Sequence, residues 1–398
     1  NLDRFFPHSE EQVERLLFQR REEARRKRLI DIGGDWLTSL MNSTSPSEEI
    51  NPEEAAEFTH ILKSYYLFEK NSKDHALAKA MITKANLDEP TGLFPLLVKL
   101  KVFDENANID LLRFEIPTEF SSEVQNATHR LAASYQGHAG EGMRKDLTSL
   151  ALMTIDGQAT VDFDDALSIE RIGDQFRLGI HIVDVGHFVH KGDIIDQEAL
   201  SRGSSIYMPD QKISMLPTGL SEGLCSLKAG EIRPAISTMV NLRPSLEIID
   251  YEILPSLIKV KHQLTYFDVN QAADQNPDLL ILREIAEKFH HQRLDAGAIQ
   301  ITVPEINVWL ADDQSITVKR INRESPGRML VSEIMIMANW LMARYLAENK
   351  MPAIFRSQPA ARGRLYKGDG GTLYQNCCFL LRRPIGGFVL VSALLSLS

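Results

Sequence analysis

The sequence predicts an α+β fold, in which a mainly helical, winged-helix-like N-terminal domain precedes a domain of strands and long helices. In the first hundred residues, apolar side chains recur at helical spacing behind recognisable helix-start signals. From Leu150 onward the spacing changes, and apolar residues alternate with polar ones. Because several strands come first and long helices follow them, we expect a mixed or antiparallel sheet.

Two helix starts define the N-terminal region. Ser9 with Gln12 forms a capping box, in which the two side chains satisfy backbone N–H groups of the first turn. Asn51, Pro52 and Glu54 supply a cap, a first-turn proline and a capping-box acid. Short helices joined by tight connections predict a helix-turn-helix or winged-helix module. Helical spacing continues over 55–66, 75–85 and 93–100.

The strongest basic cluster of the chain is RREEARRKR, at 20–28. One interpretation is a contact with nucleic-acid phosphates. The other is a solvated helix face, whose basic side chains pair with glutamates at helical spacing. We favour the solvated face.

Four segments are expected along the chain: the N-terminal domain over 1–103, a linker with one or two helices over 104–148, a catalytic-type domain over 149–376 and a tail over 377–398. Within the third segment, Gly173 and Asp174 predict a turn between two strands. Strands are predicted over 166–172, 176–182, 204–207, 237–242, 248–254, 258–264, 301–303 and 306–310, and helices over 279–293 and 329–349.

Composition sets limits on the class of protein. The 398 residues carry a formal net charge of -10, which argues mildly against a nucleic-acid binder but allows a basic channel inside an acidic whole. Three cysteines give no disulfide framework, so we expect a reducing compartment, the cytoplasm. Cys225 is interpreted as a buried small apolar residue. No signal peptide is visible, and the apolar tail is about half the ~20 residues that a membrane-spanning helix needs.

The most informative feature is a cluster of four aspartates, Asp156, Asp162, Asp164 and Asp165, in TIDGQATVDFDDALSIE. Carboxylates this close repel one another unless a cation lies among them, and flanking apolar residues place them at the edge of a core. Carboxylate oxygens suit a hard divalent ion, above all Mg²⁺, which points to phosphodiester chemistry. If the segment is extended, the side chains of Asp162 and Asp164 lie on the same face. A loop that bends at Gly157 would instead bring all four aspartates together.

The aspartates have two other interpretations. A calcium loop of the EF-hand type requires a different acidic spacing and glycine position, and strands rather than helices flank this segment. A purely structural role, with aspartates capping turns, remains open on spacing alone. His181, His187 and His190 are interpreted as structural or surface residues, because Mg²⁺ prefers oxygen ligands.

Three segments together carry a family resemblance: TIDGQATVDFDDALSIE, then GIHIVDVGHFV, then RGSSIYMPDQKISMLPTGLSEGLCSL. They resemble the catalytic RNB domain of the ribonuclease II/R family over about 149–376. Upstream, FPLLVKLKVFDENANIDLLRFEIPTEF is similar to bacterial members that carry a helix-turn-helix module in place of cold-shock barrels.

The resemblance implies an exoribonuclease that hydrolyses single-stranded RNA from the 3′ end with Mg²⁺ and releases nucleoside 5′-monophosphates. Asp156 and Asp165 would be metal ligands. Asp162 and Asp164 would complete the acidic centre, with Asp164 the residue most closely tied to catalysis.

The resemblance also implies three RNA-binding residues. Tyr207 and Tyr266 match family aromatics beside the terminal nucleotides, and Glu333 matches an acidic residue near the last nucleotide. Aromatic side chains hold bases regardless of sequence, at roughly 1–3 kcal/mol per base. Without the resemblance, the tyrosines would be assigned to core packing and Glu333 to an ordinary acid in a first helical turn.

The sequence departs from the family near its end. A segment of the type TSPIRRY, whose arginine binds the scissile phosphate in the family, has no counterpart here, and no barrel domain follows. The resemblance ends near Cys377, which a truncation or frameshift would explain, and no role is transferred to Arg382 or Arg383. Loss of one electrostatic stabiliser typically costs roughly 10²–10³ in rate.

Three functions follow as alternatives. The first is the Mg²⁺-dependent exoribonuclease, expected to act as a monomer on single-stranded RNA without a membrane. The second is a catalytically inactive RNA-binding remnant. The third is a DNA-binding regulator built on the N-terminal helices, which leaves the aspartates unexplained.

Overall fold

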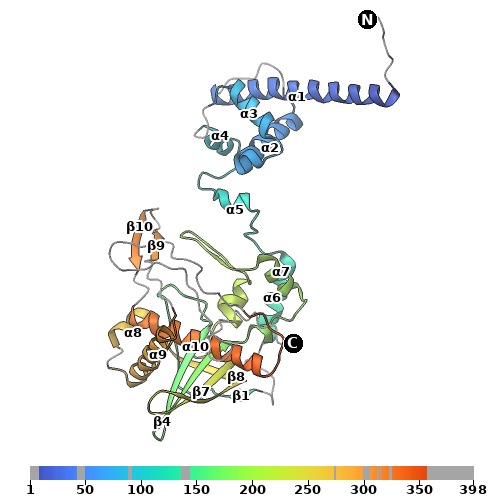
Figure 1. Cartoon of the computed structure of the whole chain (residues 1–398). Helices are drawn as coiled ribbons and strands as arrows, with labels where there is room; N and C mark the ends of the chain where they lie inside the picture. Colours follow the sequence, from blue (N-terminus) through green and yellow to red (C-terminus); the bar gives the residue numbers. More distant parts are fainter. Residues whose placement is uncertain are drawn as a thin grey trace, which may run out of the picture. The chain divides into compact units, whose positions relative to one another are not determined.

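The computed structural model describes residues 9–42, 50–87, 92–135, 144–272, 275–298, 305–311, 313, 315–321 and 325–355. The chain divides into two compact units, Asn1–Pro117 and Thr118–Ser398 (Figure 1). Within the described ranges, no helix combines the length and the apolar character needed to cross a membrane.

The first unit is helical. Both predicted capping boxes are present: Gln12 and Ser9 exchange hydrogen bonds, and so do Asn51 and Glu54. The helices pack around one apolar core that includes Leu37, Leu62 and Met81. Its helices are α1 (Glu10–Asn42), α2 (Pro52–Phe68), α3 (His75–Lys84), α4 (Leu93–Lys99) and α5 (Ile109–Arg113).

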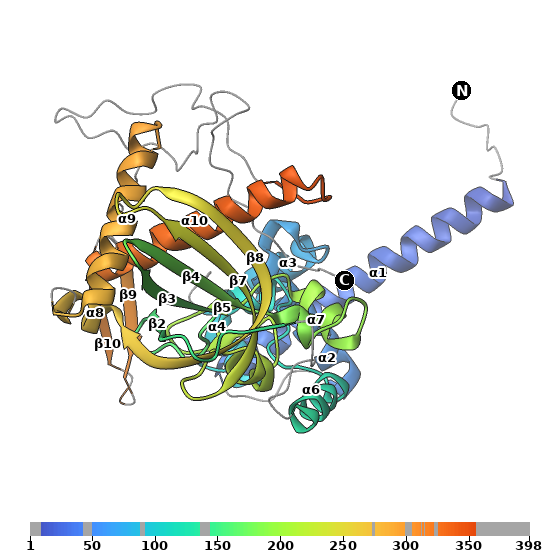
Figure 2. The same ribbon diagram turned by 90° about the horizontal axis from the view of Figure 1, so that it is seen from below.

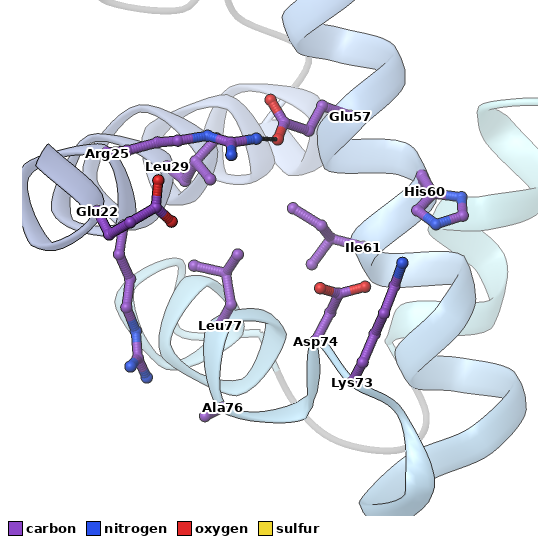
Figure 3. A pocket seen from close by; sticks show the side chains of 11 residues that line it. Glu22, Arg25, Leu29, Glu57, His60, Ile61, Lys73, Asp74, Ala76 and Leu77 are labelled. Carbon is purple, nitrogen blue, oxygen red and sulfur yellow. Dashed lines mark hydrogen bonds and ion pairs between the residues drawn. The ribbon is translucent and has the colours of Figure 1, made fainter. Parts of the chain in front are cut away.

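Two arginines of the basic cluster of α1 have acidic partners on α2 and not at helical spacing along α1. Arg25 pairs with Glu57 at 2.6 Å and Arg28 with Glu54 at 2.9 Å, so these ion pairs join two helices. The first pair borders a hollow of about 440 Å³ between α1, α2 and α3, into which Ile61 also points (Figure 3). Acidic and basic side chains both line this hollow, which gives it no preference for an anion.

The second unit combines a curved sheet with helices. Its helices are α6 (Ser122–Ser134), α7 (Ile194–Arg202), α8 (Tyr266–Ala272), α9 (Pro277–Asp295) and α10 (Pro326–Glu348). Its strands are β1 (Lys145–Asp146), β2 (Leu152–Asp156), β3 (Asp165–Ile172), β4 (Gln175–Val183), β5 (Ile206–Tyr207), β6 (Lys212–Ile213), β7 (Ile232–Leu242), β8 (Ile248–Thr265), β9 (Glu305–Leu310) and β10 (Ile316–Ile321).

The main sheet is mixed, as predicted, and has the strand order β1-β8-β2-β3-β4-β7. Strand β8 pairs antiparallel with β7 along its first part and parallel with β2 along its last part. The sheet therefore closes on itself through β8, which curves round the other strands (Figure 2).

The prediction of two strands over 248–254 and 258–264 was wrong, because β8 runs without interruption through Pro255. A proline removes one backbone donor and is tolerated where a strand has a single neighbour. Pro255 pairs with Ile236 of β7, and the second neighbour, β1, begins only at Ser256. The strand predicted over 204–207 is shorter in the structure, where only β5 at Ile206–Tyr207 is present. The strand predicted over 301–303 lies outside the described residues.

The two faces of the sheet bury different cores. One face, with Ile155, Leu167 and Ile180, packs against α9 and α10. The other, with Leu152, Ala166 and Met239, packs against α6 and neighbouring segments. Successive side chains along β2 and β3 point to opposite faces of the sheet, and this alternation assigns them to the two cores.

A polar network lies within the sheet around His181, which has no exposed surface. Its Nε2 lies 3.0 Å from the Ser168 hydroxyl and its Nδ1 lies 2.6 Å from that of Ser237, which in turn lies 2.6 Å from the Ser256 hydroxyl. Gly179 allows this packing, since a Cβ there would collide with Ser168 and His181. The predicted structural role of His181 is thereby confirmed.

Candidate active site

The aspartate cluster lies where β2 ends and β3 begins. Asp156 is the last residue of β2 and Asp165 the first of β3. The antiparallel register pairs Met153 with Leu167, which brings these two strand ends together. Asp162 and Asp164 lie in the connecting loop, so a loop and not one extended strand carries the cluster.

The loop is fixed by Ser226, whose side chain is fully buried. Its hydroxyl accepts a hydrogen bond from the Phe163 N–H at 3.0 Å and donates one to the Val161 carbonyl at 3.1 Å. The Leu227 N–H donates to the Phe163 carbonyl at 2.9 Å. On the other side, the Asp164 carbonyl accepts from the Val183 N–H at 3.0 Å. These bonds determine where the loop carboxylates are presented.

Among the described residues, no basic side chain forms an ion pair with the carboxylates at the two strand ends. Partial burial, then the charges of Asp164 and Asp162, raise the pKa of Asp156 to about 6. Burial, then Asp156 and Asp164, raise the pKa of Asp165 to about 7. The pKa of Asp164 is raised by desolvation and by Asp162, with Lys212 opposing. Because like charges and burial both disfavour the ionised forms, a cation at this position would stabilise all three.

Asp162 already has a cation. The Lys212 ammonium donates to its Oδ2 at 2.9 Å and also lies 3.4 Å from Glu222 Oε1. Although burial acts in the opposite direction, the hydrogen bond and charge of Asp162 raise the pKa of Lys212. Sequence reasoning missed Lys212, because a single lysine in MPDQKIS carries no signal that it meets a carboxylate fifty residues earlier in the chain.

Tyr207 lies beside this ion pair. It pairs with Lys212 across β5 and β6, and its hydroxyl donates to Asp162 Oδ2 at 3.2 Å. The Lys212 ammonium lies 5.5 Å from the ring centroid. With 68% of its surface exposed, the ring is available to a ligand.

Tyr266 approaches the cluster from another part of the sheet. The parallel pairing of β2 and β8 aligns Asp156 with Thr265, and Tyr266 follows as the first residue of α8. Thr265 caps this helix by exchanging hydrogen bonds with Asp268. Burial, then the charges of Asp156 and Asp165, raise the pKa of Tyr266. Both predicted tyrosines therefore lie next to predicted acidic residues.

Glu333 lies in a buried ion pair. Only 4% of its surface is exposed, and both carboxylate oxygens accept hydrogen bonds from Arg293, at 2.6 and 2.7 Å. His290 lies 2.8 Å from one of the same oxygens. This ion pair joins α9 to α10. For Glu333 to make the predicted contact with RNA, its carboxylate would have to separate from Arg293.

The donor set fits a hard cation in its chemistry. Asp156 Oδ2 is buried and has no hydrogen-bond partner among the described residues, and carboxylate oxygens are what Mg²⁺ prefers. Over the described ranges, however, no three His, Cys, Asp or Glu side chains converge closely enough to form a ready ligand set. Asp156 and Asp165 lie at the adjoining strand ends, while the loop aspartates face Lys212 and solvent.

The other singled-out residues lie outside this cluster. His187 lies 3.4 Å from the Arg144 guanidinium, which is paired with Asp184, and His190 is exposed. Cys225 is 3% exposed, and burial, then the nearby charge of Asp164, raises the pKa of its thiol to about 12. It is therefore an unreactive core residue, as predicted.

Comparisons with known proteins agree with this architecture. The RNB domain family matches residues 144–367, and a double HTH domain matches residues 13–109. Two structures of Mycoplasma genitalium RNase R, one with double-stranded RNA and one with ribose-methylated single-stranded RNA, align at a TM-score of 0.59 and 25% identity. The alignments cover 63% of this chain and 46% and 40% of theirs.

Curated relatives show the same likeness in sequence. An uncharacterized ribonuclease of Synechocystis is 30% identical over 89% of this chain and 53% of its own length. Ribonuclease R of Chlamydia trachomatis is 30% identical over 81% of this chain and 48% of its own. The chain thus spans about half the length of these relatives. With the RNB match extending over more than half of its residues, the chain belongs to the RNB domain family of ribonucleases.

Proposed function

We propose that this chain is a Mg²⁺-dependent 3′-to-5′ exoribonuclease that hydrolyses single-stranded RNA to nucleoside 5′-monophosphates. The observation that carries the proposal is the pair of half-buried carboxylates, Asp156 and Asp165, which have raised pKa values and no ion-pair partner among the described residues of an RNB domain. One of the related RNase R structures is a complex with single-stranded RNA, which supports the substrate class. We further propose that the chain acts as a monomer in the cytoplasm.

The proposed roles follow from where each side chain lies. Asp156 and Asp165 would hold Mg²⁺, and Asp164, beside them, is the proposed catalytic carboxylate. When bound, the ion would lower the pKa of a water molecule and stabilise charge on the scissile phosphate. Asp162 keeps the Tyr207 hydroxyl in place and is itself held by Lys212.

Two aromatic surfaces would hold the strand. The exposed ring of Tyr207 and the half-buried ring of Tyr266 border the carboxylates from β5 and α8. Stacking of a base on such a ring is worth roughly 1–3 kcal/mol and does not depend on base identity. Two rings beside the acidic centre therefore suit a nuclease that removes nucleotides without regard to sequence.

The test is the release of mononucleotides from uniformly labelled single-stranded RNA in the presence of Mg²⁺. The parent chain is expected to shorten the strand from its 3′ end, and Asp164→Asn to reduce the rate by about 10² or more. Asp174→Asn, in the exposed turn between β3 and β4, is the matched control and should retain the parent rate. Equal product from the parent and Asp164→Asn would defeat the assignment.

A second candidate is RNA binding without hydrolysis. It is favoured by the ion pair between Lys212 and Asp162, because this lysine neutralises one of the four carboxylates and so lowers the attraction for a metal ion. Retention of labelled RNA by the parent chain with Mg²⁺ present, and no mononucleotide over extended incubation, would select this candidate.

A further inference from the structure

Arg328 lies over the ring of Tyr266, in the first turn of α10. The centre of its guanidinium is 4.7 Å from the ring centroid, and the side chain is half-buried. Since the ring of Tyr266 is also within electrostatic range of Asp156 and Asp165, Arg328 is a cation at the border of the acidic centre.

Close packing of two helices fixes this position. The Gly327 N–H donates to the side-chain oxygen of Asn270 in α8 at 2.8 Å. A Cβ on Gly327 would lie 3.1 Å from the Tyr266 carbonyl and 3.3 Å from Val269, so the backbone of α10 meets that of α8 here. Arg328 and Tyr266 are therefore presented together by the ends of two packed helices.

Within the described part of the chain, the charge of Arg328 is not matched by a nearby acid. Among the described residues, no carboxylate lies within ion-pair distance of its guanidinium. Lys212, the other cation beside the aspartates, is already paired with Asp162 and Glu222. Of these two cations, Arg328 is thus the one whose charge remains for a ligand.

Another arginine of α10 provides a comparison. Arg344 also lies over aromatic rings, at 5.3 Å from the centroid of Trp340 and 5.8 Å from that of Tyr251. Its guanidinium, however, is paired with Glu348 at 3.1 Å. Stacking on an aromatic ring is common to both side chains, whereas only Arg344 has an acidic partner among the residues that the structure describes.

We propose that Arg328 binds a backbone phosphate of the RNA strand next to the nucleotide that contacts Tyr266. A guanidinium that stacks on a ring keeps the N–H groups at its edge free, and these suit bidentate contact with phosphate oxygens. A polyanion that approaches four carboxylates also needs fixed positive charge along its path. The assignment rests on the proposed function, because it takes the same site to be the RNA site.

The experiment measures binding of fluorescent single-stranded oligouridylate in EDTA at several salt concentrations, which separates binding from turnover. Arg328→Gln is expected to bind about tenfold more weakly than the parent, as for the loss of one charged hydrogen-bonded contact. Its plot of log affinity against log salt should be shallower by about 0.7, the value for one phosphate of a single strand. Arg328→Lys should retain the salt slope but bind more weakly than the parent.

Arg344→Gln is the matched control, since it removes a stacked arginine from the same helix, and it should bind as the parent does. Circular dichroism and melting curves establish that each variant is folded. Unchanged affinity and salt slope in folded Arg328→Gln would overturn the phosphate contact and leave the proposed function standing. Absence of RNA binding by the parent chain would overturn both.

Discussion

The buried ring of His181 makes the stability of the second unit depend on pH. Burial lowers the pKa of this histidine from 6.5 to about 3, so the ring is neutral in the folded state. Because the unfolded chain binds the proton more readily, stability is fully present above pH 6.5 and is lost as the pH falls toward 3. The experiment therefore lowers the pH and compares the resulting loss of stability in the parent and in His181→Gln.

The magnitude follows from the two pKa values. Between pH 8 and pH 5, protonation of the unfolded histidine lowers the free energy of unfolding by about 2 kcal/mol. Glutamine has no proton to gain in this range, and it retains a donor and an acceptor for Ser168 and Ser237. The substitution itself lowers the free energy of unfolding, but by an amount that does not depend on pH. Acidification should therefore lower the free energy of unfolding of the parent relative to that of His181→Gln by the same ~2 kcal/mol.

The assay is hydrogen exchange of peptides from β3 and β4 in urea, corrected for the intrinsic pH dependence of exchange. A local measurement is needed because a chain with two units does not unfold in one step. His262→Gln, on the exposed side of β8, is the matched control and should follow the parent. A difference between parent and His181→Gln that is equal at pH 8 and pH 5 would refute the reasoning.

Three further predictions concern the site and its support. Glu333→Gln should destabilise the second unit by about 3–5 kcal/mol in urea unfolding, because it removes the negative charge that Arg293 contacts through two buried hydrogen bonds; full stability of the single variant would contradict this. Ser226→Ala should cost about 1–3 kcal/mol and weaken Mg²⁺ binding in calorimetry, whereas Ser221→Ala, outside the loop contacts, should not change that binding. In EDTA at pH 8, Asp165→Asn should melt at a higher temperature than the parent, since a carboxyl with a raised pKa favours folding only while protonated and its ionised form opposes folding; an equal or lower melting temperature would argue against uncompensated charge.

Much of the fold was accessible from local pattern. The capping boxes at Ser9 and Asn51 and the turn at Gly173 depend on neighbouring residues, so sequence alone identifies them. The break predicted within β8 failed because tolerance of Pro255 depends on which strand lies beside it, and that is a property of the whole sheet.

The sequence indicated which residues gather at the candidate site, but not which other side chains contact them. The spacing of the aspartates, together with the family resemblance, identified Asp156 and Asp165 beside Tyr266, and the pairing of β2 with β8 brings them near each other. Lys212 and Arg328 were not identified, since each acts through a contact with a residue distant in sequence. Burial of Glu333 against Arg293 likewise depends on how α9 and α10 pack.

The closure of the sheet through β8 also sets the order in which the site is completed during synthesis. β8 is the last strand of this sheet to leave the ribosome, and pairing between distant strands is slow compared with local folding. The aspartates at β2 and β3 therefore emerge well before Thr265 and Tyr266 can join them. Under the proposed function, a chain synthesised only as far as β3 has the acidic residues but not the aromatic ring of Tyr266.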